Sequence, residues 1–447
     1  MELTVKEIYE FFSKVYKGKN SRVKGISIDT RSLVKGSVFF ALKGESTDGH
    51  KFIKNAVKKK AAVIINEMYD APGMLKVKDT KKALLELAGY YYSKFPELKT
   101  AAITGSNGKT TTKEILAAIM AEKYYVHKNI RSYNNHTGLP LTIFGLRRKH
   151  QVFVAEIGMN RKGEIARLVR IIKPDTAAIT NVGRAHAGFF RGVKGIAAAK
   201  AEIISGIKKN GAVVLNKDDR YYDYFAEKTA GRKIISFGIK KGIFRAKNIR
   251  REKSYTVFDI CFKGRKKKIR TKLKGIHNVY NITAAAAAAS VLGCGLNDAA
   301  EAMKKFSMKG SMRFDEKVSD GIRVINDSYN ANPDSFRASV ETIKDEGYKN
   351  IITVTGDMLE LGKGSEKAHI EAGRMLASLN PKKVFIFGKY ALYVKKGFLA
   401  ETAGADNRDV RIFASKMKLK KILKNEMKKG DTLFLKASRA NKLDEII

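Results

Sequence analysis

Short apolar runs alternate with amphipathic stretches along the whole chain. Before residue 98 the apolar runs predict strands of four residues or fewer, and one stretch repeats its apolar positions at helical spacing. We expect strands at residues 26–28, 38–41 and 62–65, and a helix at residues 80–92. A linker around Pro96 then ends the first predicted domain, residues 1–98.

From residue 100 the pattern becomes strand, loop and helix, repeated. The predicted strands of this second region are residues 101–104, 152–157, 177–182 and 212–216, with a helix at 110–120. A strand pair at 255–261 and 267–273 precedes a helix through the six alanines of residues 284–289. Strands that alternate with helices in this way are typical of a parallel, doubly wound sheet. We therefore predict an α/β domain over residues 99–307.

The same alternation starts again near residue 308. Apolar runs at residues 324–326, 351–355, 384–387 and 432–435 predict the strands of another α/β sheet. The third predicted domain spans residues 308–447. A length of 447 residues is consistent with about three domains.

The net charge of +44 allows two interpretations. It could mark a polyanion partner, or it could reflect a lysine-rich composition whose basic residues are solvated everywhere. Lys and Arg occur in all regions, with only a modest peak at residues 265–268, which favours the second interpretation. No basic patch interleaved with aromatic residues is present, so we do not expect nucleic acid as the principal partner.

Several bulk features point to a cytoplasmic protein. No stretch approaches the ~18 consecutive apolar residues of a membrane span. The first residues include acidic side chains and lack the apolar segment of a secretory signal. The cysteines, Cys261 and Cys294, lack metal-ligand spacing and read as thiols of a reducing compartment. We expect a monomer without a membrane span.

A glycine-containing loop between a predicted strand and a predicted helix is the first candidate for chemistry. Glycines let backbone N–H groups face an anion, and the helix N-terminus adds partial positive charge. A lysine in the loop suits the β- and γ-phosphates, and the following hydroxyl suits Mg²⁺. Ile103 stands where the general phosphate-loop pattern has glycine, so the loop is a variant form. The candidate nucleotide-binding residues are Gly105, Ser106, Asn107, Gly108, Lys109, Thr110 and Thr111.

This variant, Thr-Gly-Ser-Asn-Gly-Lys-Thr-Thr, resembles the ATP loop of the Mur ligase family, which also includes folylpolyglutamate and cyanophycin synthetases. Glu156 ends a predicted strand, and His186 follows the next one in Asn-Val-Gly-Arg-Ala-His. Their spacing is similar to that of the family residues that bind a second Mg²⁺. Lys200 matches the position that family members carry as a carbamylated lysine. The resemblance thus implies ATP, two Mg²⁺ ions and carbamylation of Lys200. It implies that the catalytic residues are Lys109, Lys200 and His186. The implied metal ligands are Thr110, Glu156, His186 and Lys200.

Further segments resemble family motifs in the same order along the chain. Residues 134–140, Asn-Asn-His-Thr-Gly-Leu-Pro, match a stretch associated with substrate and phosphate contacts, which implicates Asn134 and Asn135. Residues 275–281, Gly-Ile-His-Asn-Val-Tyr-Asn, match a segment whose asparagines contact adenine, here Asn278 and Asn281. Amide groups can pair with adenine's donor and acceptor edge. The resemblance also implies ATP contacts for Arg313 and, at the ribose, Asp327. Asp29, Thr30, Arg31 and Asp48 fall in segments similar to UDP-binding loops.

Two segments of the third domain bear on the substrate. Residues 326–333, Asn-Asp-Ser-Tyr-Asn-Ala-Asn-Pro, and 356–362, Gly-Asp-Met-Leu-Glu-Leu-Gly, resemble signatures of family members that use a dipeptide acceptor. In the first, Asn326 replaces an aspartate of the family pattern. The resemblance implies that Asn330 and Asn332 contact substrate.

The resemblance covers essentially the whole chain and implies a three-domain architecture. The N-terminal domain would bind the UDP-substrate, and the central phosphate-loop domain, with its parallel sheet, would bind ATP. The C-terminal domain would be Rossmann-like and bind the incoming dipeptide. The implied activity is ATP-dependent formation of a peptide bond between UDP-N-acetylmuramoyl-tripeptide and D-alanyl-D-alanine through an acyl phosphate. A sister ligase with another amino acid as acceptor, or a folylpolyglutamate synthetase, is the nearest alternative. Whether the tripeptide ends in lysine or diaminopimelate stays open.

Overall fold

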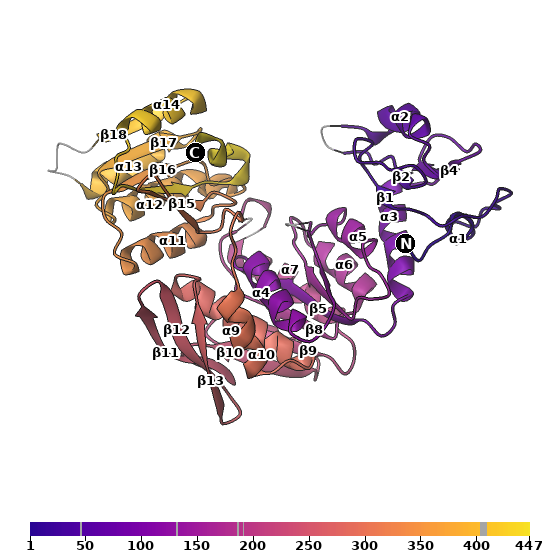
Figure 1. The fold of residues 1–447 in the computed structure, drawn as a ribbon, viewed down its shortest axis with the longest axis horizontal. Helices are drawn as coiled ribbons and strands as arrows, with labels where there is room; N and C mark the ends of the chain where they lie inside the picture. The colour runs from indigo at the N-terminus through magenta and orange to yellow at the C-terminus, as the bar shows by residue number, and fades with distance from the viewer. Residues whose placement is uncertain (45–46, 131–132, 186, 191, 403–408) are drawn as a thin grey trace.

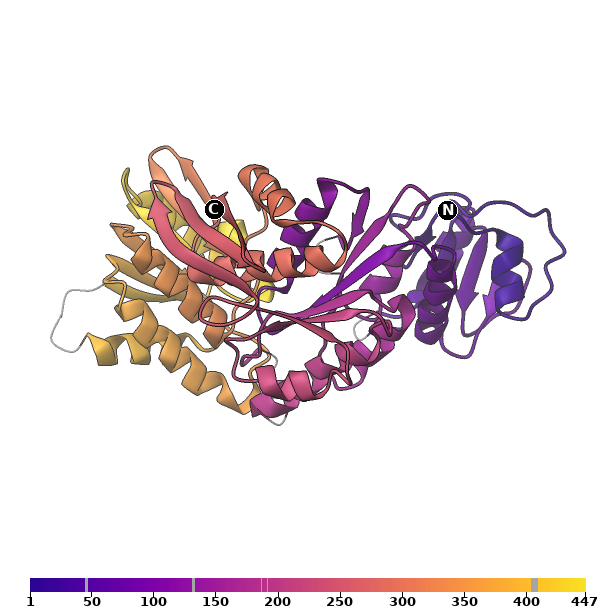
Figure 2. The ribbon, with the colours of Figure 1, turned by 90° about the horizontal axis from the view of Figure 1, so that it is seen from below.

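A computed structural model describes residues 1–44, 47–130, 133–185, 187–190, 192–402 and 409–447. The described residues form three β-sheets, and helices pack on their faces. Figure 1 and Figure 2 place the N-terminal sheet and the C-terminal sheet at opposite ends of the molecule, with the largest sheet between them. His186 lies outside the described residues.

The N-terminal sheet is parallel and has the strand order β1-β2-β3-β4. Its middle strands are buried apolar runs, which is why the sequence pattern revealed them. Its elements are α1 (Val5–Phe11), β1 (Ile26–Ser27), β2 (Val38–Phe40), η1 (Gly49–Phe52), α2 (Ile53–Lys58), β3 (Val63–Asn66), β4 (Met74–Lys76) and α3 (Thr80–Ser93).

The central sheet has the order β13-β12-β11-β10-β9-β8-β5-β7-β6 and is parallel from β11 to β6. β5 lies in the interior of the sheet, between β8 and β7, so the loops after these three strands meet at one edge. The strands are β5 (Lys99–Thr104), β6 (Val126–Lys128), β7 (Val152–Glu156), β8 (Thr176–Ile179), β9 (Ala212–Asn216), β10 (Lys233–Gly238), β11 (Phe244–Glu252), β12 (Tyr255–Phe262) and β13 (Arg265–Thr271).

Helices cover both faces of this sheet. One face packs against α4 (Lys109–Ala121), α9 (Ile276–Val291) and α10 (Leu296–Lys305). The alanine run of α9 is fully buried there, as close helix packing requires. The other face packs against α5 (Gly138–Ile143), α6 (Glu164–Ile172), α7 (Gly192–Ser205) and α8 (Tyr222–Glu227), while η2 (Ala187–Phe189) precedes α7.

The C-terminal sheet has the order β14-β15-β19-β16-β17-β18, and only β14 is antiparallel to its neighbour. One face packs against α11 to α13, and α14 and η5 pack against the other. The elements are β14 (Asp315–Ser319), β15 (Ile322–Asp327), α11 (Pro333–Asp345), β16 (Ile351–Thr355), η3 (Gly362–Gly364), α12 (Ser365–Ala377), β17 (Lys383–Phe387), α13 (Ala391–Glu401), β18 (Asp409–Phe413), α14 (Lys416–Glu426), β19 (Thr432–Lys436), η4 (Arg439–Asn441) and η5 (Leu443–Ile446).

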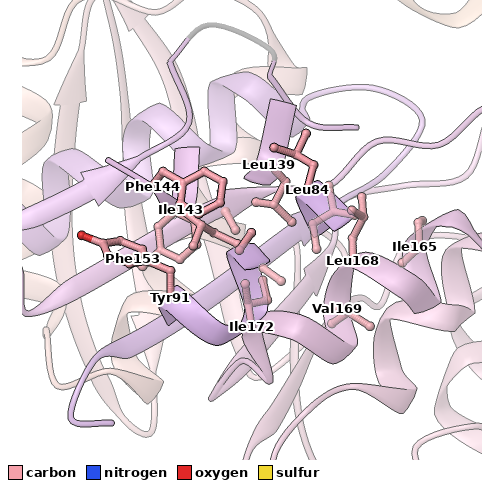
Figure 3. Packing of buried hydrophobic residues seen from close by; sticks show 14 of the residues in the cluster. Leu84, Tyr91, Leu139, Ile143, Phe144, Phe153, Ile165, Leu168, Val169 and Ile172 are labelled. Carbon is pink, nitrogen blue, oxygen red and sulfur yellow. The ribbon is translucent and has the colours of Figure 1, made fainter. Parts of the chain in front are cut away.

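One hydrophobic core joins the N-terminal and central sheets. Leu84 and Tyr91 of α3 pack against side chains of α5, α6 and β7, as Figure 3 shows, and the same cluster continues to Phe40 and Ile65 of the N-terminal sheet. Tyr91 is fully buried and donates its hydroxyl hydrogen to the Leu146 carbonyl. Most of the buried side chains of the N-terminal domain therefore belong to a core that it shares with the central domain. Only one face of its sheet has a separate small cluster.

The strands that the apolar runs predicted are present within two residues at each end, except that β8 (Thr176–Ile179) ends three residues before its predicted end. The pair at 255–261 and 267–273 is the antiparallel hairpin β12–β13. β11 and β14 were missed because most of their side chains are polar and at least partly exposed, so neither strand shows an apolar run. Among the described residues, no helix is both long and apolar enough to cross a membrane.

Candidate active site

A cleft of about 610 Å³ lies between the central and C-terminal sheets. Its walls come from the loop after β5, the loop before α5, the end of β7, the loop after β8, the start of α9 and the segment around α11. The cleft therefore lies at the carboxyl edge of the parallel central sheet, where ligands bind in open α/β folds.

The phosphate loop joins β5 to α4, and its two glycines permit close contacts. Gly105 has a φ of 155° and Gly108 a φ of 79°. A Cβ atom at Gly105 would lie 1.8 Å from Thr180 Oγ1, and one at Gly108 would lie 2.2 Å from Asn281 Oδ1. Both positions are thus confined to glycine by sterics as well as by backbone conformation.

The loop after β8 fixes the phosphate loop in place. The Ser106 N–H donates a hydrogen bond to the Asn181 carbonyl, and the Asn107 N–H donates one to Asn181 Oδ1, both at 2.9 Å. Thr180 Oγ1 donates to the Asn107 carbonyl at 2.6 Å. The sequence motifs assign no site role to Thr180 or Asn181. Their position after β8, the parallel neighbour of β5, was the signal that could have identified them.

Lys109 of the cleft and Lys200 of α7 lie close enough for the charge of Lys109 to affect Lys200. Burial lowers the pKa of Lys109, and the nearby Glu156 and Glu360 carboxylates oppose this shift. Lys109 Nζ donates to the Gly105 carbonyl at 2.8 Å. Lys200 of α7 is only 1% exposed, and its pKa is lowered well below the usual value, first by burial and then by the positive charge of Lys109. Lys200 can therefore exist as a neutral amine, the form that reacts with CO₂.

Glu156 is held at the end of β7 by asparagines of a neighbouring loop. Its carboxylate is 1% exposed, and Oε1 accepts a 2.7 Å hydrogen bond from Asn134 Nδ2. Its backbone N–H donates to Asn129 Oδ1, also at 2.7 Å. The other carboxylate oxygen, Oε2, has no hydrogen-bond partner in the described part of the chain and lies 4.0 Å from Lys113 Nζ.

A buried carboxylate oxygen without a hydrogen bond fits a cation ligand, because burial of an unsatisfied charge is otherwise costly. The described residues contain no group of three or more His, Cys, Asp or Glu side chains that could hold a metal ion. His186, which is also one of the four predicted metal ligands, lies outside the described residues. A complete oxygen-rich site therefore needs donors besides Glu156 and the Thr110 hydroxyl, and a carbamate on Lys200 would supply them.

The start of α9 lines part of the cleft. Asn278 and Asn281 are 7% and 4% exposed, and Asn281 Nδ2 donates to Asn278 Oδ1 at 3.1 Å. Neighbouring His277, to which the sequence motifs assign no role, has a buried Nδ1 without a partner among the described residues. Burial lowers the pKa of His277 to about 4, so its imidazole is neutral at pH 7.

Residues beyond α10 reach the phosphate loop from the C-terminal side. Arg313 donates to the Thr110 hydroxyl at 2.8 Å, and its guanidinium carbon lies 4.2 Å from the centroid of the Tyr329 ring. The preceding residue, Met312, has a φ of 53°, a conformation that glycine adopts more readily. Asp327 accepts hydrogen bonds from Ser339 Oγ and from the buried Lys436.

The predicted substrate asparagines make intramolecular contacts. Asn135 Oδ1 accepts from the Gly138 N–H at the start of α5, at 2.8 Å. Asn332 caps α11 and donates from Nδ2 to Asn107 Oδ1 at 2.7 Å, which ties the C-terminal domain to the phosphate loop. Asn330 is exposed and lines the cleft. Asn326 Oδ1 accepts from Ser328 Oγ and N–H, so the amide that replaces the family aspartate has a structural role.

The predicted UDP-binding residues lie away from this cleft, in the N-terminal domain. Asp29, Thr30 and Arg31 follow β1, and Asp48 follows β2 and caps η1. Because β1 and β2 are parallel neighbours, both loops leave the same edge of the sheet. The Asp29 carboxylate accepts hydrogen bonds from the Arg31 guanidinium, whose proximity lowers the pKa of that carboxyl.

Three stretches of the chain match known protein families. Residues 22–124 match the Mur ligase family catalytic domain, residues 103–289 the Mur ligase middle domain, and residues 312–439 the Mur ligase glutamate ligase domain. The UDP-N-acetylmuramoyl-tripeptide–D-alanyl-D-alanine ligase of Bacillus subtilis is 34% identical over 431 residues, which are 95% of this chain and 92% of that protein. The chain belongs to the Mur ligase family.

Solved Mur ligase structures share the fold over nearly the full length. The crystal structure of MurF from Acinetobacter baumannii superposes with a TM-score of 0.89 at 30% identity and covers 98% of this chain and 96% of that one. MurF from Thermotoga maritima, solved in complex with ADP, has a TM-score of 0.82 at 28% identity, covering 95% of this chain and 96% of that one. The predicted three-domain Mur ligase architecture is thus confirmed. The exact domain limits and the residue roles stay predictions.

Proposed function

We propose that this Mur ligase joins D-alanyl-D-alanine to UDP-N-acetylmuramoyl-tripeptide with hydrolysis of ATP to ADP and phosphate. The observation that carries the proposal is the cleft between the central and C-terminal domains. It combines a phosphate loop with Lys109, a buried carboxylate at Glu156, and Arg313 from the C-terminal side. The full-length similarity to D-alanyl-D-alanine ligases supports the choice of substrates.

Nucleotide binding falls to residues of three elements in this proposal. The backbone amides at the start of α4 and the Lys109 ammonium bind the phosphates, aided by the positive end of the helix. Asn278, Asn281 and His277, which line the cleft, offer donors and acceptors for adenine. Asp327, held by Lys436 and Ser339, offers a carboxylate to the ribose hydroxyls.

Glu156, the Thr110 hydroxyl, His186 and a carbamate on Lys200 would hold Mg²⁺ in the proposed site, alongside the phosphate oxygens. The bound ions would neutralise the phosphate charge that otherwise repels the substrate carboxylate. The unpartnered Glu156 Oε2 and the lowered pKa of Lys200 support these two residues as ligands. For His186 the support is the sequence motif alone.

The reaction needs two anions to meet in a site without water. An oxygen of the tripeptide's terminal carboxylate attacks the γ-phosphorus, and the bond between that phosphorus and the ADP oxygen breaks. The amine of D-alanyl-D-alanine then attacks the acyl carbon, inorganic phosphate leaves with the former carboxylate oxygen, and the amine loses a proton. Lys109 and Arg313 stabilise the transferring phosphoryl group electrostatically. Contact between the two domains keeps water from the acyl phosphate.

The test is ADP release by the purified protein over a panel of acceptors. ADP should form only when UDP-N-acetylmuramoyl-tripeptide, D-alanyl-D-alanine, ATP and Mg²⁺ are all present. Donors that end in lysine and in diaminopimelate are compared in parallel, because the choice between them is open. Lys109→Ala should abolish turnover and keep the wild-type melting temperature. Equal rates with single amino acids, with glutamate included as the folylpolyglutamate-type acceptor, would reject the dipeptide assignment.

A further inference from the structure

No residue of the segment 356–362 lines the cleft, although the Glu360 carboxylate is close enough to Lys109 to raise its pKa. The Asp357 carboxylate accepts hydrogen bonds from the backbone N–H groups of Lys389 and Tyr390, at 2.9 and 3.0 Å. Met358 and Leu361 are 1% and 5% exposed and belong to the C-terminal core. These inward contacts fix the segment in its own domain and leave the backbone around Glu360 and Gly362 facing outward.

The outward backbone touches the central domain at a glycine. The Gly188 N–H of η2 donates a 2.9 Å hydrogen bond to the Glu360 carbonyl. A Cβ atom built on Gly188 would lie 2.7 Å from Gly362 N, and one on Gly362 would lie 2.8 Å from Gly188 Cα. Glu360 has a φ of 65°, a conformation that residues with a side chain seldom adopt. The two domains therefore meet here backbone to backbone, in a space that only glycine fits.

The loop that precedes η2 makes contacts in both directions. Arg184 pairs with Glu371 of α12 through two hydrogen bonds of 2.8 and 3.1 Å, and its backbone N–H donates to Asp334 of α11 at 2.7 Å. On the other side, the Gly183 N–H donates to Ser106 Oγ of the phosphate loop at 2.8 Å. Residues 181–184, the bridge loop, thus connect the C-terminal domain to the phosphate loop.

We propose that residues 356–362 are a docking segment whose contact with Gly188, together with the Arg184–Glu371 pair, positions the bridge loop and so aligns the phosphate loop for phosphoryl transfer. The proposal rests on the ligase function above for its kinetic readout. It assigns the segment to closure of the active site rather than to direct contact with the dipeptide. Gly188, Arg184 and Glu371 are positioning residues in this scheme, because they act through the loop and touch no reacting atom.

Gly188→Ala tests the docking contact without removal of any polar group. The added methyl group collides with backbone only when the domains are docked, and the backbone of Gly188 is not in the left-handed region, so alanine is tolerated otherwise. Gly195→Ala in α7 is the matched control, because its Cβ meets Phe190 at an ordinary contact distance of 3.5 Å.

We expect Gly188→Ala to lower kcat at least about tenfold, because misplaced catalytic groups are costly, and to leave the KM for the UDP-tripeptide and the melting temperature unchanged. Gly195→Ala should match the wild type. Arg184→Met should lower kcat in the same direction, whereas Arg374→Met, which breaks the exposed Arg374–Glu401 pair of the C-terminal domain, should not.

Hydrogen exchange and small-angle X-ray scattering give readouts that need no turnover. Residues 187–189 should exchange faster in Gly188→Ala than in the wild type, and the radius of gyration with ADP and both substrates should be larger. Wild-type kcat in Gly188→Ala, or unchanged exchange and scattering, overturns the docking role. If the wild type itself forms no ADP with the dipeptide, the ligase proposal fails, while exchange and scattering still decide the docking contact.

Discussion

Asn134→Ala is the sharpest single perturbation of the proposed metal site. The side chain of Asn134 donates a 2.7 Å hydrogen bond to Glu156 Oε1, and Glu156 is 1% exposed. A hydrogen bond to a charged group contributes about 1.5–3 kcal/mol. Loss of such a contact behind a metal ligand typically lowers metal affinity or activity by about 10- to 100-fold, which is consistent with that energy.

The assay is ADP release as a function of free Mg²⁺ at saturating substrates. Asn134→Ala should raise the Mg²⁺ concentration needed for half-maximal rate by about 10- to 100-fold, because Glu156 loses the contact that orients its carboxylate. The KM for UDP-tripeptide should stay close to the wild-type value. Binding of Mn²⁺ in the presence of ADP, followed by its paramagnetic resonance signal, should weaken in parallel.

Asn135→Ala is the matched control. Asn135 is the next residue, but its side chain accepts backbone hydrogen bonds at the start of α5 and does not contact Glu156. Its loss should lower stability by about 0.5–2 kcal/mol and leave the Mg²⁺ requirement unchanged. If Asn134→Ala raises the KM for UDP-tripeptide and leaves the Mg²⁺ dependence intact, Asn134 contacts substrate and our reasoning about Glu156 is refuted.

Three further outcomes are expected. Leu84→Ala removes a fully buried side chain from the core between α3 and the central domain. It should lower the free energy of unfolding, measured by urea titration, by about 2–5 kcal/mol. A free energy of unfolding equal to that of the wild type within error would mean that α3 is not fixed there. Wild-type protein in ¹³C-bicarbonate should show a carbamate resonance that Lys200→Met lacks; identical spectra would argue against carbamylation. The pKa of His277 is about 4 in the folded protein and near 6.5 when unfolded, so the unfolded state binds the extra proton between these values. Stability should therefore rise with pH over this window, by at most about 1.4 kcal/mol per pH unit from this group, and His277→Gln should flatten the slope.

The sequence predicted strands well where they are buried on both faces. β7 and β16 are buried at every position and mostly apolar because helices cover both sides of their sheets, so the pattern itself reflects their position. β11, with the sequence Phe-Arg-Ala-Lys-Asn-Ile-Arg-Arg-Glu, carries mostly exposed charged side chains and shows no such run. Its strand conformation depends on pairing with β10 and β12, which no local pattern encodes.

The candidate site was predictable to the extent that its residues carry recognisable chemistry. The phosphate loop follows from residue types and spacing, whereas Lys200 is one of many lysines until its burial is known. The Asn134–Glu156 contact depends on which loop lies beside the end of β7, and this is a property of the tertiary fold. Gly188 and Gly362 have no side chains at all, so their contact could emerge only from the backbone geometry of two domains.

Transfer of a carboxylate oxygen to phosphate tests the central claim most directly. UDP-N-acetylmuramoyl-tripeptide labelled with ¹⁸O in its terminal carboxylate is incubated with the protein, ATP, Mg²⁺ and D-alanyl-D-alanine, and the released phosphate is analysed by mass spectrometry. Activation through an acyl phosphate predicts one ¹⁸O atom in each phosphate, in step with formation of the extended peptide. Peptide formation accompanied by unlabelled phosphate would contradict the account.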